Sequence, residues 1–290
     1  MASNVDVLIV FYNSSKFIGP LLESLRAISI PITAYFLDNN SRDGTAEKLA
    51  RELPNISFPA FMFRSDTNQG FARGINLLSR QGKGEFIFAL NPDAELEAGC
   101  LERLMAKAES DSTIAIAEAR QSPREHPKAV DASTGETTWC SGAAALVRRQ
   151  AFEQVGCFDE RLFFMYCEDV DLSWKLWLSN WKCIYVRDAV VRHYTQDLVG
   201  RKRRTAENYF TFRNSLFLFY RFGPWNGRSV LWSYLWKRLM SSNYTIASKI
   251  LFVFAFVDHI RYIPHLLHTR HTWGNREHPW VRLEETSLTN

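Results

Sequence analysis

The first 110 residues repeat one pattern four times: a short apolar run, a few polar residues, and then apolar positions three or four residues apart. The apolar runs cover residues 5–10, 34–37, 57–63 and 85–90. Unbroken runs of this length are typical of strands buried on both faces, and the spaced positions are typical of covering helices. The pattern predicts an α/β fold with a mixed, mainly parallel sheet, right-handed crossovers and helices on both faces.

The polar residues after these runs are the first candidates for a binding site. Carboxyl ends of parallel strands meet at one edge of a sheet, where ligands bind. We therefore expect four groups to converge there: Tyr12 with Asn13, Asp38, residues 68–70 and residues 91–93. The Asp38 carboxylate could accept a hydrogen bond from a nucleobase imide. The nearby Ser41, Asp43 and Thr45 are equally well explained as caps of the next helix.

Asn91-Pro92-Asp93 follows a strongly apolar strand and places a hard oxygen ligand at the sheet edge. Such a ligand suits Mg²⁺ or Mn²⁺ bridging a diphosphate. The same tripeptide is common in turns, so both interpretations stay open.

The regular alternation ends near residue 113. Residues 139–147 are predicted to form a strand that contains Ser141 and Gly142. Glu168, Asp169 and Asp171 then open a helix, where acidic side chains interact favourably with the helix dipole. Crowded carboxylates among apolar neighbours would raise one pKa, which suits a general base, although a charged first turn explains them without any function.

Composition and cysteine usage narrow the class of protein. Apolar residues make up 46% and charged residues 23% of the chain, which excludes a disordered or collagen-like chain. The five cysteines form no CxxC pair, so we expect neither a disulfide framework nor a zinc module, and a cytoplasmic location fits. The longest apolar run, residues 250–257, is far shorter than the ~20 residues that cross a bilayer. We therefore predict that the chain does not span a membrane.

Charge is divided unevenly along the chain. Residues 196–290 contain 14 Lys and Arg against 6 Asp and Glu, a net +8, whereas the remainder carries 21 against 25, a net −4. The basic region suggests attraction to membrane lipid, phosphate or nucleic acid. Its aromatic and basic helices could form an interfacial surface on a membrane, or pack on the catalytic core or a second subunit. The basic cluster at residues 201–204 could contact a diphosphate or only solvent.

Seven stretches resemble the family 2 inverting glycosyltransferases with a GT-A fold, most closely their bacterial rhamnosyltransferase-like branch. They occur in the family's order over roughly residues 5–220 and read VLIVFYN, LDNNSRDGT, NQGFARGIN, FALNPDAEL, CSGAAALVRR, FDERLFFMYCEDVDLSWKL and the Arg213-Asn214 pair after His193. One such motif would be weak, but seven in order are specific.

The resemblance implies a nucleoside diphosphate sugar as donor, with Tyr12, Asn13 and Asp38 around the base and Asn68 and Gly70 near the ribose and diphosphate. Residues 91–93 take the place of the family's Asp-x-Asp element. Here Asn91 replaces the first aspartate, so Asp93 is the only charged ligand of the tripeptide. His193, by itself a common structural residue, matches the family histidine that completes coordination of Mn²⁺ or Mg²⁺.

The same resemblance implies that Asp169, with Glu168 beside it, is the general base of a single displacement with inversion. Trp139, Ser141 and Gly142 match the acceptor pocket, although core packing explains Trp139 equally well. We expect a catalytic domain over residues 1–215, divided near residue 112 into a donor half and an acceptor half, and a helical extension over residues 216–290.

The expected reaction moves a sugar, for example rhamnose from dTDP-rhamnose or a sugar from a UDP-sugar, to a hydroxyl of a cell-surface glycan or its lipid-linked precursor. We expect it in the cytoplasm or on the cytoplasmic face of the membrane, by an enzyme that could be a homodimer and has no nucleic-acid partner. A dinucleotide oxidoreductase is excluded because no GxGxxG follows the first strand. A nucleotidyltransferase lacks its Gly-rich basic loop, and a non-enzymatic binding module leaves the carboxylates unused.

Overall fold

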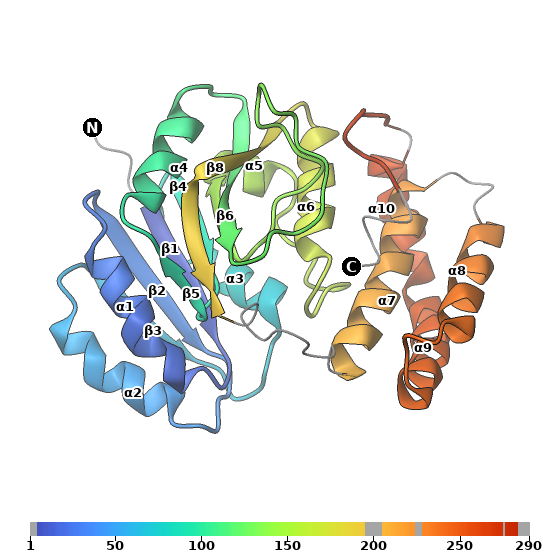
Figure 1. Ribbon diagram of the computed structural model, residues 1–290, viewed down its shortest axis with the longest axis horizontal. Coiled ribbons are helices and arrows are strands. Elements are labelled where there is room, and N and C mark those ends of the chain that lie inside the picture. The colour runs from blue at the N-terminus through green and yellow to red at the C-terminus, as the bar shows by residue number, and fades with distance from the viewer. Residues whose placement is uncertain (1–4, 195–204, 224–227, 275, 284–290) are drawn as a thin grey trace.

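The computed structural model describes residues 5–194, 205–223, 228–274 and 276–283 (Figure 1). The basic cluster at residues 201–204 lies outside them. One eight-stranded sheet runs in the order β3-β2-β1-β4-β7-β6-β8-β5. Its strands are β1 (Val5–Phe11), β2 (Ile32–Asp38), β3 (Ala60–Arg64), β4 (Phe86–Leu90), β5 (Ala94–Leu96), β6 (Ile114–Ser122), β7 (Ala144–Arg148) and β8 (Lys182–His193).

The expected mixed sheet is confirmed. The pairs β1–β2, β1–β4, β2–β3 and β6–β8 are parallel, whereas β7 runs antiparallel to β4 and β6, and β5 runs antiparallel to β8. The parallel pairs are joined through helices, as such connections require. The carboxyl ends of β1, β2 and β4 consequently meet at one edge of the sheet.

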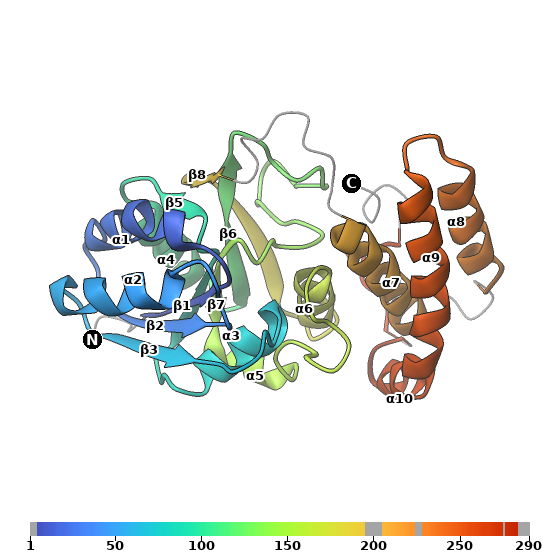
Figure 2. The ribbon, with the colours of Figure 1, turned by 90° about the horizontal axis from the view of Figure 1, so that it is seen from below.

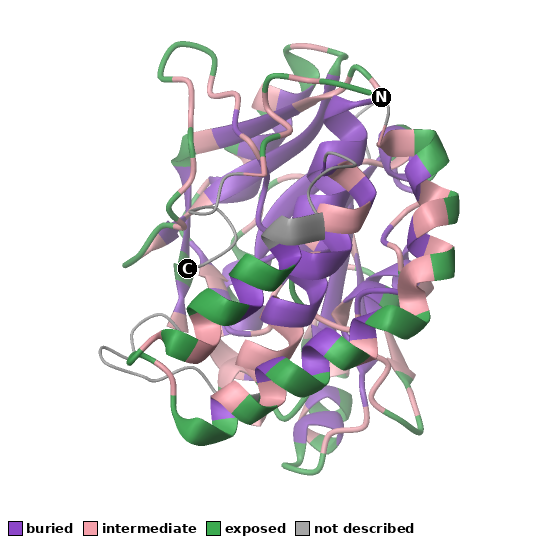
Figure 3. Ribbon diagram, turned by 90° about the vertical axis from the view of Figure 1, so that its right-hand side faces the viewer, coloured by how far each residue is buried: buried purple, intermediate pink, exposed green. Residues whose placement is uncertain are grey.

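Helices cover both faces of this sheet, with most buried residues inside (Figures 2 and 3). On one face lie α1 (Ile18–Arg26), α2 (Thr45–Glu52) and α4 (Cys100–Glu109), and on the other α3 (Phe71–Ser79), α5 (Arg149–Gln154) and α6 (Glu168–Trp177). Short 3₁₀ helices span Ser15–Phe17 and Leu53–Asn55. Alternate residues of β1 enter the two cores, since Leu8 and Val10 join one and Val7 and Ile9 the other.

A helical region follows the sheet. It comprises α7 (Thr205–Phe222), α8 (Arg228–Met240), α9 (Ile246–Asp258), a 3₁₀ helix (His259–Tyr262) and α10 (Ile263–Trp273). Helices α7, α8 and α9 share a small core of their own, while Phe217 of α7 and Leu266 of α10 join the core of the α6 side. Helix α7 is continuous across residue 215, so the expected domain boundary falls within it.

Two sequence expectations need correction. The strand expected over residues 139–147 begins only at Ala144, because the backbone before it bonds to side chains of α6: Cys140 N–H donates to Ser173 Oγ at 3.0 Å. The segment Ile246–Trp273, 28 residues of nearly continuous helix, is long and apolar enough to cross a membrane by length and composition alone. The argument that no segment is long and apolar enough therefore does not hold, while the absence of a membrane span stays a prediction.

Candidate active site

The first predicted group does converge where β1 and β2 end. Phe11 pairs with Asp38, which places Asn13 beside the loop after β2. The Asn13 backbone is left-handed (φ 51°), and its Oδ1 accepts a hydrogen bond from Arg42 N–H at 2.8 Å. Asp38 is buried and accepts from Ser41 N–H at 3.3 Å, while Tyr12 projects into solvent. The three residues thus lie close together at this edge of the sheet.

The capping explanation of the residues after Asp38 is not confirmed, because the N-cap residue of α2 is Gly44 and no side chain caps it; Asp43 instead holds the loop before this helix. Its carboxylate accepts hydrogen bonds from Ser15 N–H at 3.0 Å and Thr45 N–H at 3.1 Å. Burial alone would raise the pKa of Asp43, but these hydrogen bonds hold it below its usual value. Asp43 therefore fixes the loop between β2 and α2.

Asn39 connects this part of the sheet edge to the next predicted group. Its Nδ2 donates to Asn68 Oδ1 at 2.9 Å and to Gly70 O at 3.2 Å, and its Oδ1 accepts from Gln69 N–H at 2.7 Å. The sequence analysis missed Asn39, although its place directly after Asp38 is a usable signal. Gly70 has φ +78°, and a Cβ there would lie 2.2 Å from the carbonyl oxygen of Phe164. The backbone therefore requires glycine.

Asp93 and His193 are brought together by two strands. In the antiparallel pair of β5 and β8, Ala94 lies opposite His193, so His193 Nε2 comes within 3.3 Å of Asp93 Oδ1. The other ring nitrogen, Nδ1, lies 2.9 Å from Gln121 Oε1. Gln121 therefore orients the imidazole ring, whose Nε2 faces Asp93.

Asn91 joins the loop after β4 to the segment before β7. Its backbone N–H donates to Ala143 O at 2.8 Å, next to Gly142. A Cβ at Gly142 would lie 3.1 Å from the ring of Phe71, the residue after Gly70. The loops after β4, before α3 and before β7 therefore meet at this point.

Asp169 opens α6 at the same meeting point. Its Oδ2 accepts from Gly142 N–H at 3.2 Å and its Oδ1 from Val170 N–H at 2.9 Å, and the residue is half-buried. Burial raises the pKa of Asp169 despite these hydrogen bonds. A carboxylate with a raised pKa is a stronger base than a free aspartate.

Glu168 and Asp171 differ in their partners. Glu168 is buried, and among the described residues its Oε2 has no hydrogen-bond partner. Burial and the charge of Asp169 raise the pKa of Glu168 well above its usual value. Asp171, by contrast, forms ion pairs with Arg221 and, at 3.2 Å, with Lys175 Nζ. Asp171 is therefore a structural carboxylate.

Trp139 is held by a buried ion pair that the sequence analysis did not find. Lys128 pairs with Glu118, donates to Trp139 O at 2.9 Å, and lies 4.8 Å from the centre of the Trp139 ring. His126 packs against the same ring at 5.3 Å. Trp139 is buried, as the core-packing alternative predicted.

The loop before α6 has an unusual backbone. Tyr166 and Cys167 both have positive φ, 68° and 67°, directly before Glu168. Asn214 of α7 donates to Met165 O at 2.8 Å and Tyr166 O at 2.7 Å, and Arg213 donates to Leu162 O at 3.3 Å. Helix α7 thus fixes the loop that presents Asp169.

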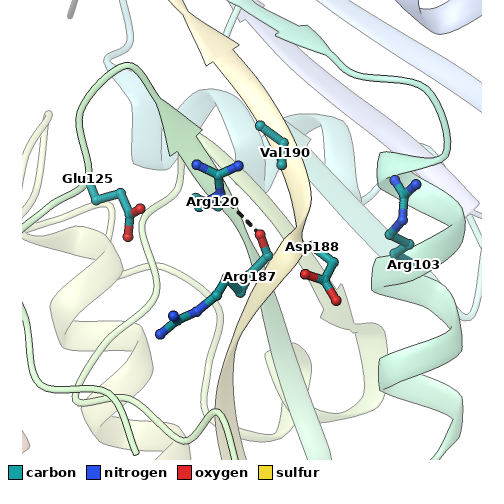
Figure 4. A pocket seen from close by; sticks show the side chains of 6 residues that line it. All are labelled: Arg103, Arg120, Glu125, Arg187, Asp188 and Val190. Carbon is teal, nitrogen blue, oxygen red and sulfur yellow. Dashed lines mark hydrogen bonds between the residues drawn. The ribbon is translucent and has the colours of Figure 1, made fainter. Parts of the chain in front are cut away.

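A separate pocket lies over β6 and β8 (Figure 4). It forms where the register between these strands shifts, and Arg120 Nε donates across it to Arg187 O at 3.1 Å. Its lining residues are Arg103, Arg120, Glu125, Arg187, Asp188 and Val190. The predicted site residues are not among them, so the pocket is distinct from the converging loops.

Two protein-family models match the chain over the residues described above. The family model described as "Glycosyl transferase family 2" matches residues 6–156, more than half of the chain, and the one described as "Glycosyl transferase family group 2" matches residues 120–274. The N-acetylglucosaminyl-diphospho-decaprenol L-rhamnosyltransferase of Mycobacterium tuberculosis is 27% identical over 249 residues, 69% of this chain and 79% of the relative. The O-antigen chain rhamnosyltransferase RfbN of Salmonella typhimurium is 27% identical over 212 residues, 65% and 66% of the two chains.

Solved structures show the same fold. The mannosyltransferase PcManGT of Pyrobaculum calidifontis, in complex with GDP-Man and Mn²⁺, matches with a TM-score of 0.61 at 17% identity, over 94% of this chain and 74% of that one. TarS of S. aureus, residues 1–349, matches with a TM-score of 0.56 at 16% identity, over 93% and 91%. The strand order, the meeting loops and the family match agree. The protein therefore belongs to glycosyl transferase family 2 and is a glycosyltransferase with a GT-A fold.

Proposed function

We propose that the enzyme transfers a sugar, rhamnose in the first instance, from a nucleoside diphosphate sugar to a hydroxyl of a lipid-linked glycan precursor or cell-surface glycan, with inversion. The observation that carries the proposal is the half-buried Asp169, whose pKa is raised by burial where the donor-side and acceptor-side loops meet. Rhamnose is chosen because the relatives from M. tuberculosis and S. typhimurium are both rhamnosyltransferases.

The donor half would hold the nucleotide. The buried Asp38 carboxylate suits the imide N–H of a thymine or uracil base, with Tyr12 and Asn13 at the same edge of the sheet. The fixed loop of Asn68 and Gly70 would lie beside the ribose and diphosphate. UDP-sugars share that imide, so a UDP-sugar is the second donor to test.

A carboxylate oxygen of Asp93 and the imidazole Nε2 of His193 are a donor set that fits Mn²⁺ or Mg²⁺. Among the described residues no cluster of three acidic, histidine or cysteine side chains could hold a metal ion, so the diphosphate itself would supply further oxygens. When bound, such an ion would neutralise charge on the departing diphosphate. Solved neighbours bind Mn²⁺ alongside GDP-Man or UDP.

Asp169 would take the proton of the acceptor hydroxyl. As that oxygen forms its bond to the anomeric carbon, the bond from this carbon to the diphosphate oxygen breaks, and the electron pair leaves with the nucleoside diphosphate. The attack from the opposite face inverts the anomeric centre. Glu168 lies beside the base, and the loop of Ser141 and Gly142 would line the acceptor, with the buried Trp139 beneath it.

We further propose that residues 1–215 bind both substrates and that the reaction takes place in the cytoplasm. All five cysteines lie in described parts of the chain and are free thiols, which supports a reducing compartment.

Thermal unfolding with a panel of dTDP-rhamnose, UDP-GlcNAc and GDP-mannose, with and without Mn²⁺, tests the donor and the metal site together. A ligand that binds only the folded state raises the melting temperature by mass action. We expect dTDP-rhamnose to stabilise the wild type with Mn²⁺, and Asp93→Ala to lose this effect. Asp111→Ala is the matched control, because Asp111 pairs with Lys182 away from these loops. Stabilisation by another nucleotide sugar alone would replace the donor.

The transfer itself is tested with a GlcNAc-diphospho-lipid acceptor and the donor that stabilises best. We expect release of nucleoside diphosphate that depends on the acceptor, and a product of inverted anomeric configuration by NMR. Retention of configuration would overturn the single displacement.

A further inference from the structure

We propose that the outer faces of α8 and α9, with the 3₁₀ helix that follows, form a surface that binds anionic lipid bilayers. The surface consists of exposed apolar side chains of these helices. They are Trp232, Trp236, Met240, Ile246, Ile250, Val253, Phe254, Val257 and Ile260. Helices α8 and α9 lie at the end of the molecule away from the sheet (Figure 1). This inference goes beyond the proposed function and does not depend on it.

The residues form a continuous stripe on α9. Ile246, Ile250, Val253, Phe254 and Val257 recur at the spacing of one helix face, and Ile246 is 79% and Phe254 62% exposed. The opposite face, including Phe252 and Ala255, is buried against α7 and α8. Helix α9 therefore has two apolar faces, of which one covers the protein core. The other is available for a further apolar partner.

Helix α8 extends the stripe sideways. Trp232, Trp236 and Met240 follow one another at every fourth position, and all three are more than half exposed. The Trp232 ring packs 4.7 Å from the ring of Phe256, so the exposed face of α8 lies directly beside α9. Exposed tryptophans are the side chains that favour the interface between water and hydrocarbon.

Charge identifies the partner as an anionic bilayer. Residues 231–261 contain Lys237, Arg238, Lys249 and Arg261 against a single acid, Asp258. Basic residues beside an apolar face bind anionic headgroups while the apolar side chains enter the interface. In a symmetric dimer the same basic residues would face their own copies, which disfavours a second chain as the occupant.

The surface lies on a membrane rather than crossing it. Within Ile246–Trp273, Phe252 and Leu266 are buried in protein, and Arg270 is buried with its guanidinium donating to Tyr220 O at 2.6 Å and Gly223 O at 2.5 Å. His265 Nε2 lies 3.0 Å from Asp159 Oδ2. A spanning helix would have to give up these contacts, whereas interfacial binding keeps all of them.

Vesicle flotation with the full-length chain tests the proposal without any sugar substrate. We expect binding to phosphatidylcholine vesicles that contain phosphatidylglycerol, and weaker binding to phosphatidylcholine alone or at high salt. Trp236→Ser and Phe254→Ser should each weaken partitioning about tenfold. Phe61→Ser is the matched control, because Phe61 is an exposed aromatic of β3, an edge strand of the sheet, and should bind like the wild type.

Lys249→Glu adds an electrostatic arm: it should reduce binding to the anionic vesicles and leave binding to neutral vesicles unchanged. Circular dichroism and thermal melts of each variant establish that the fold is retained. Failure of the wild type to float with anionic vesicles, or flotation of Trp236→Ser and Phe254→Ser equal to that of the wild type, would overturn the proposal. A dimer in ultracentrifugation that these two substitutions dissociate would reassign the surface to a second copy of the chain.

Discussion

The side-chain amide of Asn214 donates a 2.7 Å hydrogen bond to the carbonyl oxygen of Tyr166. The contact joins α7, a helix of the C-terminal region, to the loop that presents Asp169 three residues later. Asn214 is fully buried, and the same amide also donates to Met165 O at 2.8 Å. The left-handed backbone of Tyr166 and Cys167 is thus held from outside the sheet domain.

Asn214→Ala should lower kcat by about tenfold or more while the KM for the donor stays unchanged. The two carbonyl groups lose their donor, which costs about 1–3 kcal/mol of stability each and lets the Asp169 loop shift. Steady-state kinetics with each substrate varied in turn measure the changes in kcat and in KM separately. Asn76→Ala is the control, since the Asn76 side chain also donates to a buried backbone carbonyl, Phe158 O, at 2.9 Å. An equal loss of kcat in both variants would reduce Asn214 to a purely structural role.

Gly70→Ala should destabilise the protein and abolish binding of the donor. The new Cβ would lie 2.2 Å from Phe164 O in a backbone of φ +78°, so the loop must move. Gly156→Ala is the matched control, because Gly156 has φ +83° but nothing within 4 Å of the new Cβ. The control should cost only the left-handed strain, about 1–2 kcal/mol. Chemical denaturation and donor titration compare the two; similar losses would show that the close approach to Phe164 is unimportant.

The sequence located most of these loops, because chemistry-bearing residues stand directly after apolar runs and parallel strands bring their ends together. It could not show the partners that come from distant segments. Asn39 bonds to Asn68 across 29 positions, and Asn214 bonds to Tyr166 across 48 positions. Neither asparagine lies in a periodic pattern that marks it, and the same is true of Lys128. The pairing of Asp93 with His193 likewise depends on β5, a three-residue strand too short for any periodicity to indicate.

The exposed stripe of α9 was only partly foreseen for a related reason. Apolar spacing marks a helix but does not tell which face is covered, since Phe252 and Phe254 are both phenylalanines and only Phe252 is buried. The interruption by Asp258 concealed the continuity of the helical segment. In the fold this carboxylate accepts hydrogen bonds from Tyr209 at 2.8 Å and Arg213 at 3.1 Å.

Asp169→Asn should lose transfer activity by about 10²–10⁴-fold and still bind the donor. Because burial raises the pKa of Asp169, the folded protein binds this proton more tightly than the unfolded chain. The resulting stability is complete below the unfolded pKa and is lost as pH rises through the folded pKa. The variant should therefore melt at the same temperature as the wild type or higher at neutral pH.

The matched control is Asp171→Asn, which removes charge from a carboxylate paired with Arg221 and Lys175 and should melt lower. Transfer by Asp169→Asn within tenfold of the wild type would show that another group is the base. The pH profile adds an independent readout: activity should rise with pH through the pKa of the Glu168–Asp169 pair, which titrates as a unit.

Arg221→Met should destabilise the protein by about 3–5 kcal/mol at neutral pH, because the buried Asp171 and the mostly buried Asp159 lose the guanidinium that they share. Arg221 is almost completely buried and pairs with Asp171 of α6 and, at 2.5 Å, with Asp159. Burial alone would raise the pKa of Asp159, but Arg221 and a hydrogen bond from His265 hold it below its usual value. This pairing gives stability above the unfolded pKa that is lost as pH falls through the folded pKa.

Urea unfolding between neutral and acidic pH therefore separates an ionic role from simple packing. The deficit of Arg221→Met should shrink in acid, where the carboxylates of both proteins become protonated. Adding Asp159→Asn and Asp171→Asn to Arg221→Met should recover part of the lost stability at neutral pH, since the two carboxylate charges that Arg221 neutralised are then gone. Arg26→Met, which breaks a surface pair with Glu52 at 3.7 Å, should cost at most about 1 kcal/mol. A deficit that is independent of pH and is not reduced by the two asparagines would assign Arg221 a packing role alone.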